Sequence, residues 1–301
     1  MTEPDLAEFL DRHKLPGSYI ELARRWFFPL AEEIATPLDQ HDRPLILGIN
    51  GSQGSGKSTL GDLLQFLFNR HYRLRTVVLS IDDFYYTREQ RKQLAETIHP
   101  LMATRGVPGT HDVNLILDVI RDLQNPATTT AIPRFDKAAD DRAPEEFWDA
   151  VEGSPDIILF EGWCIGARPQ DESELVEAVN ALEAGEDTDG TWRRYVNSIL
   201  AGKYQQLFAL IDTWIMLKAP SFDCVYKWRL EQEQKLRHSR ENNDGEDASA
   251  SRVMTDDEIA RFIQYYQRIT ENLLQTLPSR VDYLYELDEQ RNIIAMRTPG
   301  R

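Results

Sequence analysis

The 301-residue sequence has only two cysteines, Cys164 and Cys224, and no uninterrupted apolar run long enough to cross a bilayer. Two cysteines are too few for a disulfide scaffold or a four-ligand zinc site, so we expect reduced thiols. The first residues, MTEPDLAEFLDRHKLPGSY, lack the basic start and apolar centre of a signal peptide. The sequence therefore predicts a cytoplasmic protein without a membrane partner.

Positive charge is also scarce, because 34 Lys and Arg residues face 50 Asp and Glu residues and leave a net charge of −16. Non-specific nucleic-acid binding depends on a positive surface, so this composition argues against a nucleic-acid partner. The same charge repels anionic substrates at long range. A negatively charged substrate would therefore need a local basic pocket.

Apolar β-rich runs alternate with helical patterns along the chain, which predicts an α/β fold with a mostly parallel sheet and helices on both faces. We expect residues 1–42 to form an N-terminal helical segment packed on a core domain of residues 43–301. The expected strands are 43–50, 75–81, 128–135, 154–163, 212–220 and 281–288. The expected helices include 57–72, 112–124, 221–241 and 255–277. Asp112 near a helix start and the Thr255/Glu258 capping-box spacing mark two of the helix beginnings.

Two polar segments, 181–192 and 238–254, contain few apolar residues and are expected to be surface loops. The first contains a DxxG string, Asp187 to Gly190, which we attribute to chance. The sequence has neither the LSGGQ-like signature of transporter ATPases nor the [NT]KxD motif of GTPases. These absences argue against a GTPase switch and against an ATP-driven transporter or motor.

A Walker A pattern, Gly51-x-x-x-x-Gly56-Lys57-Ser58, lies between an expected strand and an expected helix. Its glycines let the backbone turn several N–H groups towards phosphate oxygens, and the helix N-terminus adds partial positive charge. We expect Lys57 to reach the β- and γ-phosphates and Ser58 to hold Mg²⁺. The alternative is an ordinary glycine turn that caps a helix.

Acidic residues follow two other expected strands, where the carboxyl ends of a parallel sheet open a ligand crevice. Glu161 ends the run DIILFEGW and is a candidate second ligand for the metal. Asp82 and Asp83 end the run VVLSIDDF, where a carboxylate could accept the proton of an attacking hydroxyl. Successive strand residues point to opposite faces, so only one aspartate should face the site. The alternative is that these residues only form turns.

Together these motifs carry a resemblance to a known family. The strings GSQGSGKSTL, LSIDDFYYT, GVPGTHD, PRFDKAADDR, ILFEGWCIG, YKWRLEQE and ELDEQRN span residues 47 to about 292. In this order they resemble the D-glycerate 3-kinase family, within the phosphoribulokinase, uridine kinase and pantothenate kinase group of P-loop kinases. The resemblance implies a P-loop NTPase three-layer fold with a lid helix in the region 221–254. It also implies that ATP, Mg²⁺ and a small-molecule acceptor bind.

The resemblance implies roles for particular residues. The expected catalytic residues are Lys57, Asp82 and Arg229. The expected ATP-binding residues are Gly51, Ser52, Gln53, Gly54, Ser55, Gly56, Lys57, Ser58, Thr59, Arg229, Arg237 and Arg291. Ser58, Asp82 and Glu161 are the expected metal ligands. The expected substrate-binding residues are Asp82, Tyr85, Arg105, His111, Arg134, Lys137 and Arg142. Apart from Asp82, they are candidates from residue chemistry, because an acidic acceptor needs positive groups and Tyr85 could bond a substrate hydroxyl. The alternative for each is a solvated charge or a core tyrosine.

Spacing supports the lid separately, because Arg229, Glu233 and Arg237 form one stripe of a helix, although a surface salt-bridge ladder would show the same pattern. The leading hypothesis is an ATP-dependent kinase that converts D-glycerate to 3-phosphoglycerate. One alternative is a kinase of another small acceptor, such as a nucleoside or pantothenate. Another is a nucleotide-dependent regulator without a small acceptor.

Overall fold

The computed structural model describes the backbone of residues 3–36, 43–241 and 254–299, and the side chains of these except 3–5 and 235–241. Its centre is a six-stranded sheet in the order β10-β9-β8-β1-β7-β2. The strands are β1 (Leu45–Gly51), β2 (Thr76–Ser80), β7 (Ile157–Gly162), β8 (Thr213–Lys218), β9 (Tyr283–Leu287) and β10 (Ile293–Arg297). All are parallel except β10, which runs antiparallel to β9. The predicted mostly parallel sheet is confirmed.

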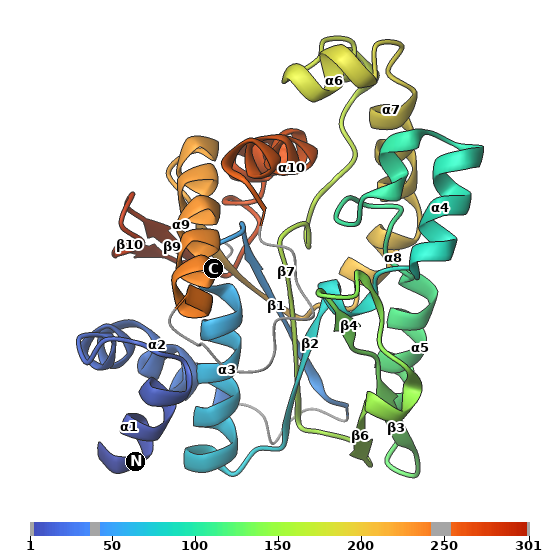
Figure 1. Cartoon of the computed structure of the whole chain (residues 1–301). Coiled ribbons are helices and arrows are strands. Elements are labelled where there is room, and N and C mark those ends of the chain that lie inside the picture. The colour runs from blue at the N-terminus through green and yellow to red at the C-terminus, as the bar shows by residue number, and fades with distance from the viewer. Residues whose placement is uncertain (1–2, 37–42, 242–253, 300–301) are drawn as a thin grey trace.

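Helices lie on both sides of this sheet, with α1, α2 and α3 on one side and α4, α5 and α8 on the other (Figure 1). Every residue of β1 and β7 is buried, as expected for strands covered on both faces. The helices are α1 (Glu3–Arg12), α2 (Tyr19–Ala35), α3 (Lys57–Leu67), α4 (Arg88–Thr97), α5 (Val113–Leu123), α6 (Ala181–Glu186), α7 (Thr191–Ile199), α8 (Gln205–Phe208), α9 (Phe222–Glu241) and α10 (Asp256–Thr276).

Short elements complete the chain and include two small sheets outside the central one. Strand β3 (Thr129–Ile132) pairs with β6 (Asp149–Glu152), and β4 (Phe135–Asp136) pairs with β5 (Asp141–Arg142). Of the expected strand 128–135, residues 129–132 form β3, which lies in a two-stranded sheet with β6 and not in the central sheet. The short helices are η2 (Phe68–Tyr72), η3 (Ile81–Phe84), η4 (Pro100–Ala103), η5 (Glu145–Phe147), η6 (Glu172–Leu175) and η7 (Leu200–Tyr204).

The N-terminal helices pack on the core. The phenyl ring of Phe27 in α2 meets the ring of Tyr285 in β9 edge-on, with centroids 5.5 Å apart. Tyr285 also donates a hydrogen bond of 3.2 Å to the carbonyl of Trp26. The expected boundary near residue 42 falls beside residues 37–42, outside the described part, and stays a prediction.

Both helix-start predictions are confirmed. The carboxylate of Asp112 accepts a hydrogen bond from the amide of Leu115 at the start of α5. Thr255 and Glu258 form a complete capping box at the start of α10, which satisfies amide groups that the helix leaves free.

The prediction of a surface loop at 181–192 is wrong. Residues 181–186 form helix α6, and Asp187 is fully buried, where its carboxylate accepts hydrogen bonds from the amides of Trp192 and Arg193. The DxxG string is therefore a structural helix cap, not a nucleotide motif. Of the second polar segment, 238–241 continue α9, and 242–253 lie outside the described residues.

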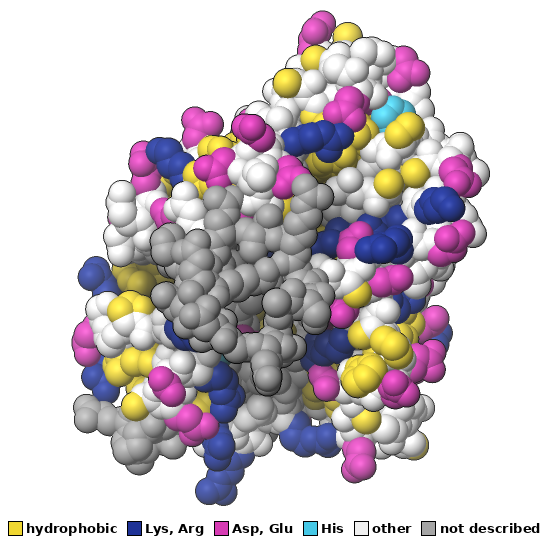
Figure 2. Space-filling view, viewed as in Figure 1, with side chains coloured by type: hydrophobic (Ala, Val, Ile, Leu, Met, Phe, Trp, Pro, Cys, Tyr) yellow, Lys and Arg dark blue, Asp and Glu magenta, His cyan; other side chains and the backbone are white. Residues whose placement is uncertain are grey.

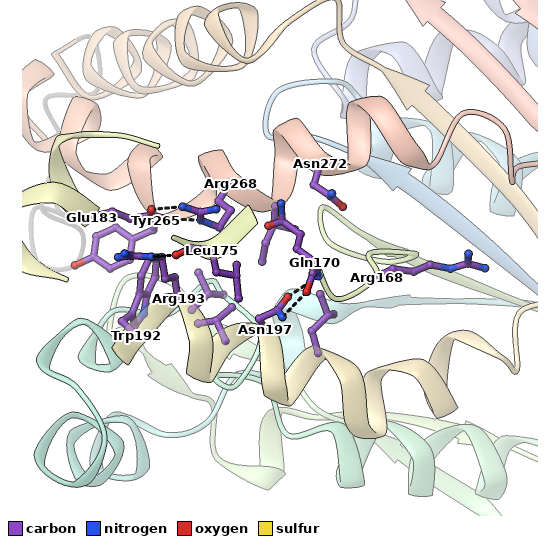
Figure 3. Close-up of a pocket in the computed structure, with 14 residues that line it drawn as sticks. Arg168, Gln170, Leu175, Glu183, Trp192, Arg193, Asn197, Tyr265, Arg268 and Asn272 are labelled. Carbon is purple, nitrogen blue, oxygen red and sulfur yellow. Dashed lines mark hydrogen bonds and ion pairs between the residues drawn. The ribbon is translucent and has the colours of Figure 1, made fainter. Parts of the chain in front are cut away.

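Two buried arginines hold the segment from η6 to α7 in place, and one of them, Arg268, belongs to α10 (Figure 3). Arg268 of α10 pairs with Glu183 over 2.6 Å, and Arg193 of α7 donates to the carbonyl of Leu175 over 2.7 Å. The polar composition of residues 181–192 does not reveal these contacts, because a buried charge is stable only once its partner is in place.

On the face shown in Figure 2, acidic and basic side chains are interspersed. None of the helices in the described ranges combines the length and apolar character that a bilayer crossing requires.

Candidate active site

The predicted phosphate loop connects the end of β1 to the start of α3. Gly54 and Gly56 adopt φ values of +77° and +91°, which side-chain-bearing residues rarely tolerate. A Cβ atom on Gly51 would lie 2.4 Å from Oγ of Ser55 and 3.2 Å from Cβ of Lys57, so a side chain there would displace the Ser55 hydroxyl. The loop ends at the N-terminus of α3, where free amide groups and the helix dipole favour an anion.

The register of the parallel strands brings Glu161 to this loop. Strand β7 lies between β1 and β2, and Glu161 is paired with Ile49 on one side and Ser80 on the other. Ser58 donates a hydrogen bond of 3.0 Å to Oε1 of Glu161, and Nζ of Lys57 lies 3.9 Å from Oε2. Burial raises the pKa of Glu161, and Lys57 opposes that rise. The side chains expected to hold phosphate and metal therefore meet at one point.

The oxygen atoms at this point fit a divalent cation such as Mg²⁺. Oε2 of Glu161 is buried and accepts no hydrogen bond from the described residues, which leaves a carboxylate lone pair free beside the hydroxyl of Ser58. Hard cations prefer such oxygen donors, and Mg²⁺ in kinases takes few protein ligands because phosphates and water supply the rest. The described residues contain no cluster of three or more His, Cys, Asp or Glu side chains suited to a metal.

Asp82 lies on η3, directly after β2, where two groups hold its carboxylate. Tyr85 donates to Oδ1 over 2.9 Å, and Nζ of Lys137 lies 3.3 Å from Oδ2. Burial alone would raise the pKa of Asp82, but the charges of Lys137 and Lys57 and the Tyr85 hydrogen bond lower it below the ordinary value. The carboxylate is therefore ionised at neutral pH and can accept a proton.

Asp83 is directed away from this group. Its Oδ2 pairs with Arg134 over 2.8 Å, and its Oδ1 accepts a hydrogen bond of 3.2 Å from the amide of Phe135. Burial raises the pKa of Asp83, and Arg134 opposes that rise. The two aspartates separate as predicted, but the reason differs, because they occupy a 3₁₀ turn and not alternating strand positions.

Asp82 and the phosphate loop line one cavity of about 750 Å³. Ten of the residues predicted from the sequence contribute to its wall: Gln53, Gly54, Lys57, Ser58, Asp82, Tyr85, Arg105, Lys137, Glu161 and Arg229. Its volume is within the range of about 300–1,000 Å³ that is usual for ligand pockets.

Six further residues line this cavity and were missed by the sequence analysis: Lys14, Ser80, Trp163, Gln232, Phe262 and Tyr266. Trp163 belongs to the ILFEGW string, so its position two residues after Glu161 was an available signal. Phe262 and Tyr266 are four residues apart on amphipathic α10, a spacing that core residues share. Lys14 carried no signal, because it follows α1 far from the motifs.

A network of aromatic residues fixes the position of Arg105. Trp163 donates to the carbonyl of Gly106 over 3.2 Å, and Tyr266 donates to the carbonyl of Arg105 over 3.3 Å. Gly106 has a φ of +143°, and a Cβ there would lie 2.3 Å from the hydroxyl of Tyr266. The guanidinium of Arg105 is ion-paired with Asp140. A cationic group is thereby held at the cavity wall near Asp82.

Three predicted substrate residues lie outside the cavity lining. Arg134 pairs with Asp83 and Asp149, and Arg142 donates to the carbonyl of Tyr85 over 2.9 Å. His111 stacks behind Tyr85 with ring centroids 4.5 Å apart. The structure thus gives these residues contacts that position Asp83 and Tyr85, and no direct access to the cavity.

Of the arginines predicted to bind the nucleotide, one lines the cavity and another lies outside its lining. Arg229 of α9 lines the cavity and pairs with Glu233 over 2.8 Å. Arg291 lies over the ring of Trp228 at 5.6 Å and pairs with Glu231, outside the lining. The side chain of Arg237 lies outside the described residues. Ser52 and Ser55 are buried in the loop. Gly51 at the end of β1, Gly56 before α3 and Thr59 in α3 do not line the cavity.

Comparison with known proteins finds several relatives, although no protein-family model matches the chain. An uncharacterised kinase of Schizosaccharomyces pombe is 34% identical over 79% of this chain and 84% of its own. The chloroplastic D-glycerate 3-kinase of Arabidopsis thaliana is 32% identical over 83% of this chain and 54% of its own. The solved structure of a D-glycerate 3-kinase from Cryptococcus neoformans superposes with a TM-score of 0.72 and 25% identity over 89% of this chain and 99% of its own. The similarity therefore extends well beyond the phosphate loop.

Proposed function

Because the chain belongs to the D-glycerate 3-kinase family of P-loop kinases, and is therefore a phosphotransferase, we propose that it transfers the γ-phosphoryl group of ATP to the primary hydroxyl of D-glycerate. The observation that carries the proposal is that Asp82 and the Lys57–Ser58–Glu161 group line the same cavity. A nucleotide regulator without an acceptor would have no need of an ionised aspartate beside the phosphate site.

The reaction follows from the charges at the site. The amides of the phosphate loop and Lys57 hold the β- and γ-phosphates of ATP, and Asp82 takes the proton of the acceptor hydroxyl. The hydroxyl oxygen forms a bond to the γ-phosphorus while the bond to the β–γ bridging oxygen breaks, which releases ADP. Arg229 neutralises the charge that spreads over the transferring group. Ser58 and Glu161 would hold Mg²⁺, with Asp82 beside them, and this ion supplies further charge neutralisation when bound.

An acidic acceptor fits the cations of the cavity wall. Arg105 presents a planar guanidinium that can bind a carboxylate through two hydrogen bonds, and Lys137 lies at the rim with its side chain 65% exposed. Both cations already have an ion-pair partner, Asp140 for Arg105 and Asp82 for Lys137, so an acidic acceptor would join or replace these pairs. We propose Arg105 as the main carboxylate anchor and Lys137 as a second contact.

An acceptor screen tests the proposal. Purified protein is incubated with ATP and Mg²⁺ plus D-glycerate, uridine or pantothenate, while ADP release is followed and the product is identified by ³¹P NMR. We expect D-glycerate alone to accelerate ADP release and to yield 3-phosphoglycerate. Turnover with uridine or pantothenate instead would reassign the acceptor, and ATP turnover that no acceptor changes would favour the regulator.

The Arg105→Gln variant tests the anchor. We expect the KM for D-glycerate to rise about tenfold or more with the KM for ATP little changed, because one charge-assisted pair is lost. Arg121→Gln is the matched control, since Arg121 is exposed on α5 and pairs with its helix neighbour Asp118. Equal KM values for D-glycerate in both variants would exclude Arg105 as the anchor.

A further inference from the structure

A fully buried arginine, Arg91 of α4, shares a counter-ion with the proposed carboxylate anchor Arg105. Arg91 is 1% exposed, and its guanidinium donates to the backbone carbonyls of Tyr86 over 3.2 Å, Ala103 over 2.8 Å and Asp140 over 2.5 Å. A buried cation also needs a negative partner, because it has lost its water. Asp140 supplies that charge, with Oδ2 at 3.0 Å from Nη2 of Arg91.

The carboxylate of Asp140 is divided between the two arginines. Its Oδ1 accepts a hydrogen bond from Arg105, and its Oδ2 accepts one from Arg91. Within the described part of the chain, no other carboxylate lies at ion-pair distance from either guanidinium. Two cations thus share one anion, and the Arg91–Asp140–Arg105 triad carries one net positive charge.

The turn between β4 and β5 holds Asp140 against α4. Asp140 has a φ of +54°, a left-handed conformation that aspartate adopts more readily than most residues with a side chain. Arg88, at the start of α4, fixes the turn on both sides of it. The Arg88 guanidinium donates to the carbonyl of Ala139 over 2.7 Å, and the Arg88 amide donates to Oδ1 of Asp141 over 3.0 Å. The carboxylate of Asp140 is therefore held in place by its own backbone.

The triad presents its positive member to the active-site cavity. Arg105 lines that cavity, whereas Asp140 and Arg91 are absent from its lining. The ring of Phe135 supports both cations, since its centroid lies 5.3 Å from the guanidinium carbon of Arg105 and 5.9 Å from that of Arg91. A molecule in the cavity therefore meets a guanidinium whose charge is only partly neutralised.

We propose that this triad makes the cavity selective for an acidic acceptor over a neutral molecule of the same shape, an inference that rests on the proposed function. Asp140 positions Arg105, and the buried Arg91 keeps Asp140 from neutralising it. Lys137 and Asp82 offset each other as a pair, so the triad supplies the excess positive charge at this end of the cavity. Arg91 thus acts on the acceptor through Arg105, without touching it.

Calorimetry without ATP tests the selectivity, with D-glycerate and its neutral amide, D-glyceramide, as probes that differ mainly in charge. We expect the wild type to bind the acid about fivefold tighter or more. Asp140→Asn gives the triad two net charges, so this preference should rise about threefold or more. A purely structural role of Asp140 would weaken both probes alike. Asp118→Asn, an exposed aspartate on α5, is the matched control and should keep the wild-type preference.

A charge rescue tests the buried arginine. Arg91→Gln leaves Asp140 to neutralise Arg105, so the preference for the acid should fall about threefold or more. The double variant Arg91→Gln/Asp140→Asn again has one net charge and should return to within about twofold of the wild type. Asp140→Asn alters a side chain that is 33% exposed, and it decides the proposal alone if Arg91→Gln does not fold. An unchanged or lower preference in Asp140→Asn would overturn the proposal, as would a folded double variant without rescue.

An assay of ADP release separates this inference from the proposed function. Phosphorylation of D-glycerate, together with a wild-type preference in Asp140→Asn, would overturn the inference and leave the proposed function standing. Charge-dependent binding of D-glycerate without its phosphorylation would refute the proposed function and support the inference. No binding of D-glycerate to the wild type would overturn both.

Discussion

The hydroxyl of Tyr85, the residue that follows the 3₁₀ turn η3, donates a 2.9 Å hydrogen bond to Oδ1 of Asp82 within that turn. Together with Lys137 and Lys57, this bond keeps the pKa of Asp82 below its ordinary value although burial would raise it. The pair thus combines orientation of the carboxylate with control of its ionisation.

The Tyr85→Phe variant tests this pair. Loss of the donor removes a group that favours the ionised form, so the pKa of Asp82 should rise and the acidic limb of the kcat profile should move to higher pH. We also expect kcat at neutral pH to fall about tenfold. Measurement of kcat against pH, with Tyr72→Phe on η2 as control, checks both. If the acidic limb of the kcat profile stayed at the same pH, Tyr85 would not control the pKa of Asp82.

The Gly54→Ala variant tests the loop geometry. Gly54 has a φ of +77°, and a Cβ there would lie 2.7 Å from Cβ of Trp228 on α9. We expect ATP affinity to fall about tenfold or more and the free energy of unfolding to fall by about 1–3 kcal/mol. Gly185→Ala on α6 is the control, since its Cβ would meet nothing within 4 Å. ATP titration measures the affinity, and thermal unfolding measures the stability. Wild-type ATP affinity in the Gly54 variant would contradict the assignment of residues 51–58 as the phosphate loop.

The Glu161→Gln variant tests the metal site. The carboxylate accepts the Ser58 hydrogen bond and has a free buried oxygen, so its neutral amide should bind Mg²⁺ more weakly. At fixed ATP we expect the Mg²⁺ concentration for half-maximal rate to rise about tenfold. Glu96→Gln, exposed on α4, should not change it. An unaltered Mg²⁺ titration would remove Glu161 from the metal site.

The stability of the protein should depend on pH through His111. Burial lowers the pKa of this histidine from 6.5 to about 4, and the charge of Asp82 opposes that change only partly. The unfolded chain therefore binds a proton between these pH values that the folded chain does not, and the free energy of unfolding must fall as the pH falls. Between pH 7 and pH 5 we expect the wild type to lose about 2 kcal/mol more than His111→Gln. Denaturant unfolding at both pH values measures this, and parallel losses would show that His111 is charged in the fold.

Most of the fold could be predicted from the sequence, because its signals are local. The phosphate loop, the buried strands and the Thr255 capping box depend on residue types within a few positions of one another. The prediction of a loop at 181–192 was wrong because the contacts that order this segment are distant in the sequence. Its polar residues Glu183 and Asp187 find their partners in Arg268 and Arg193, and Arg268 lies on a helix far along the chain.

The residues of the candidate site also differ in whether a local sequence motif reveals them. Lys57, Ser58, Asp82 and Glu161 follow from motifs at strand ends, and parallel register brings them together. Phe262 and Tyr266 could not be assigned in this way, because an aromatic side chain in a cavity wall has the same local pattern as one in the core. Arg134 and Arg142 have partners within the chain and lie outside the cavity lining, and charge alone does not reveal such an intramolecular partner.

The central claim is that Asp82, and not its neighbour Asp83, activates the acceptor. Its most direct test compares the kcat of Asp82→Asn with that of Asp83→Asn, each with D-glycerate and saturating Mg·ATP, alongside ATP affinity. We predict that Asp82→Asn lowers kcat about 10²–10⁴-fold with ATP affinity little changed, whereas Asp83→Asn, which loses the Arg134 pair, lowers stability and leaves kcat within about threefold. Near-wild-type kcat in Asp82→Asn, or a kcat loss confined to Asp83→Asn, would contradict the account.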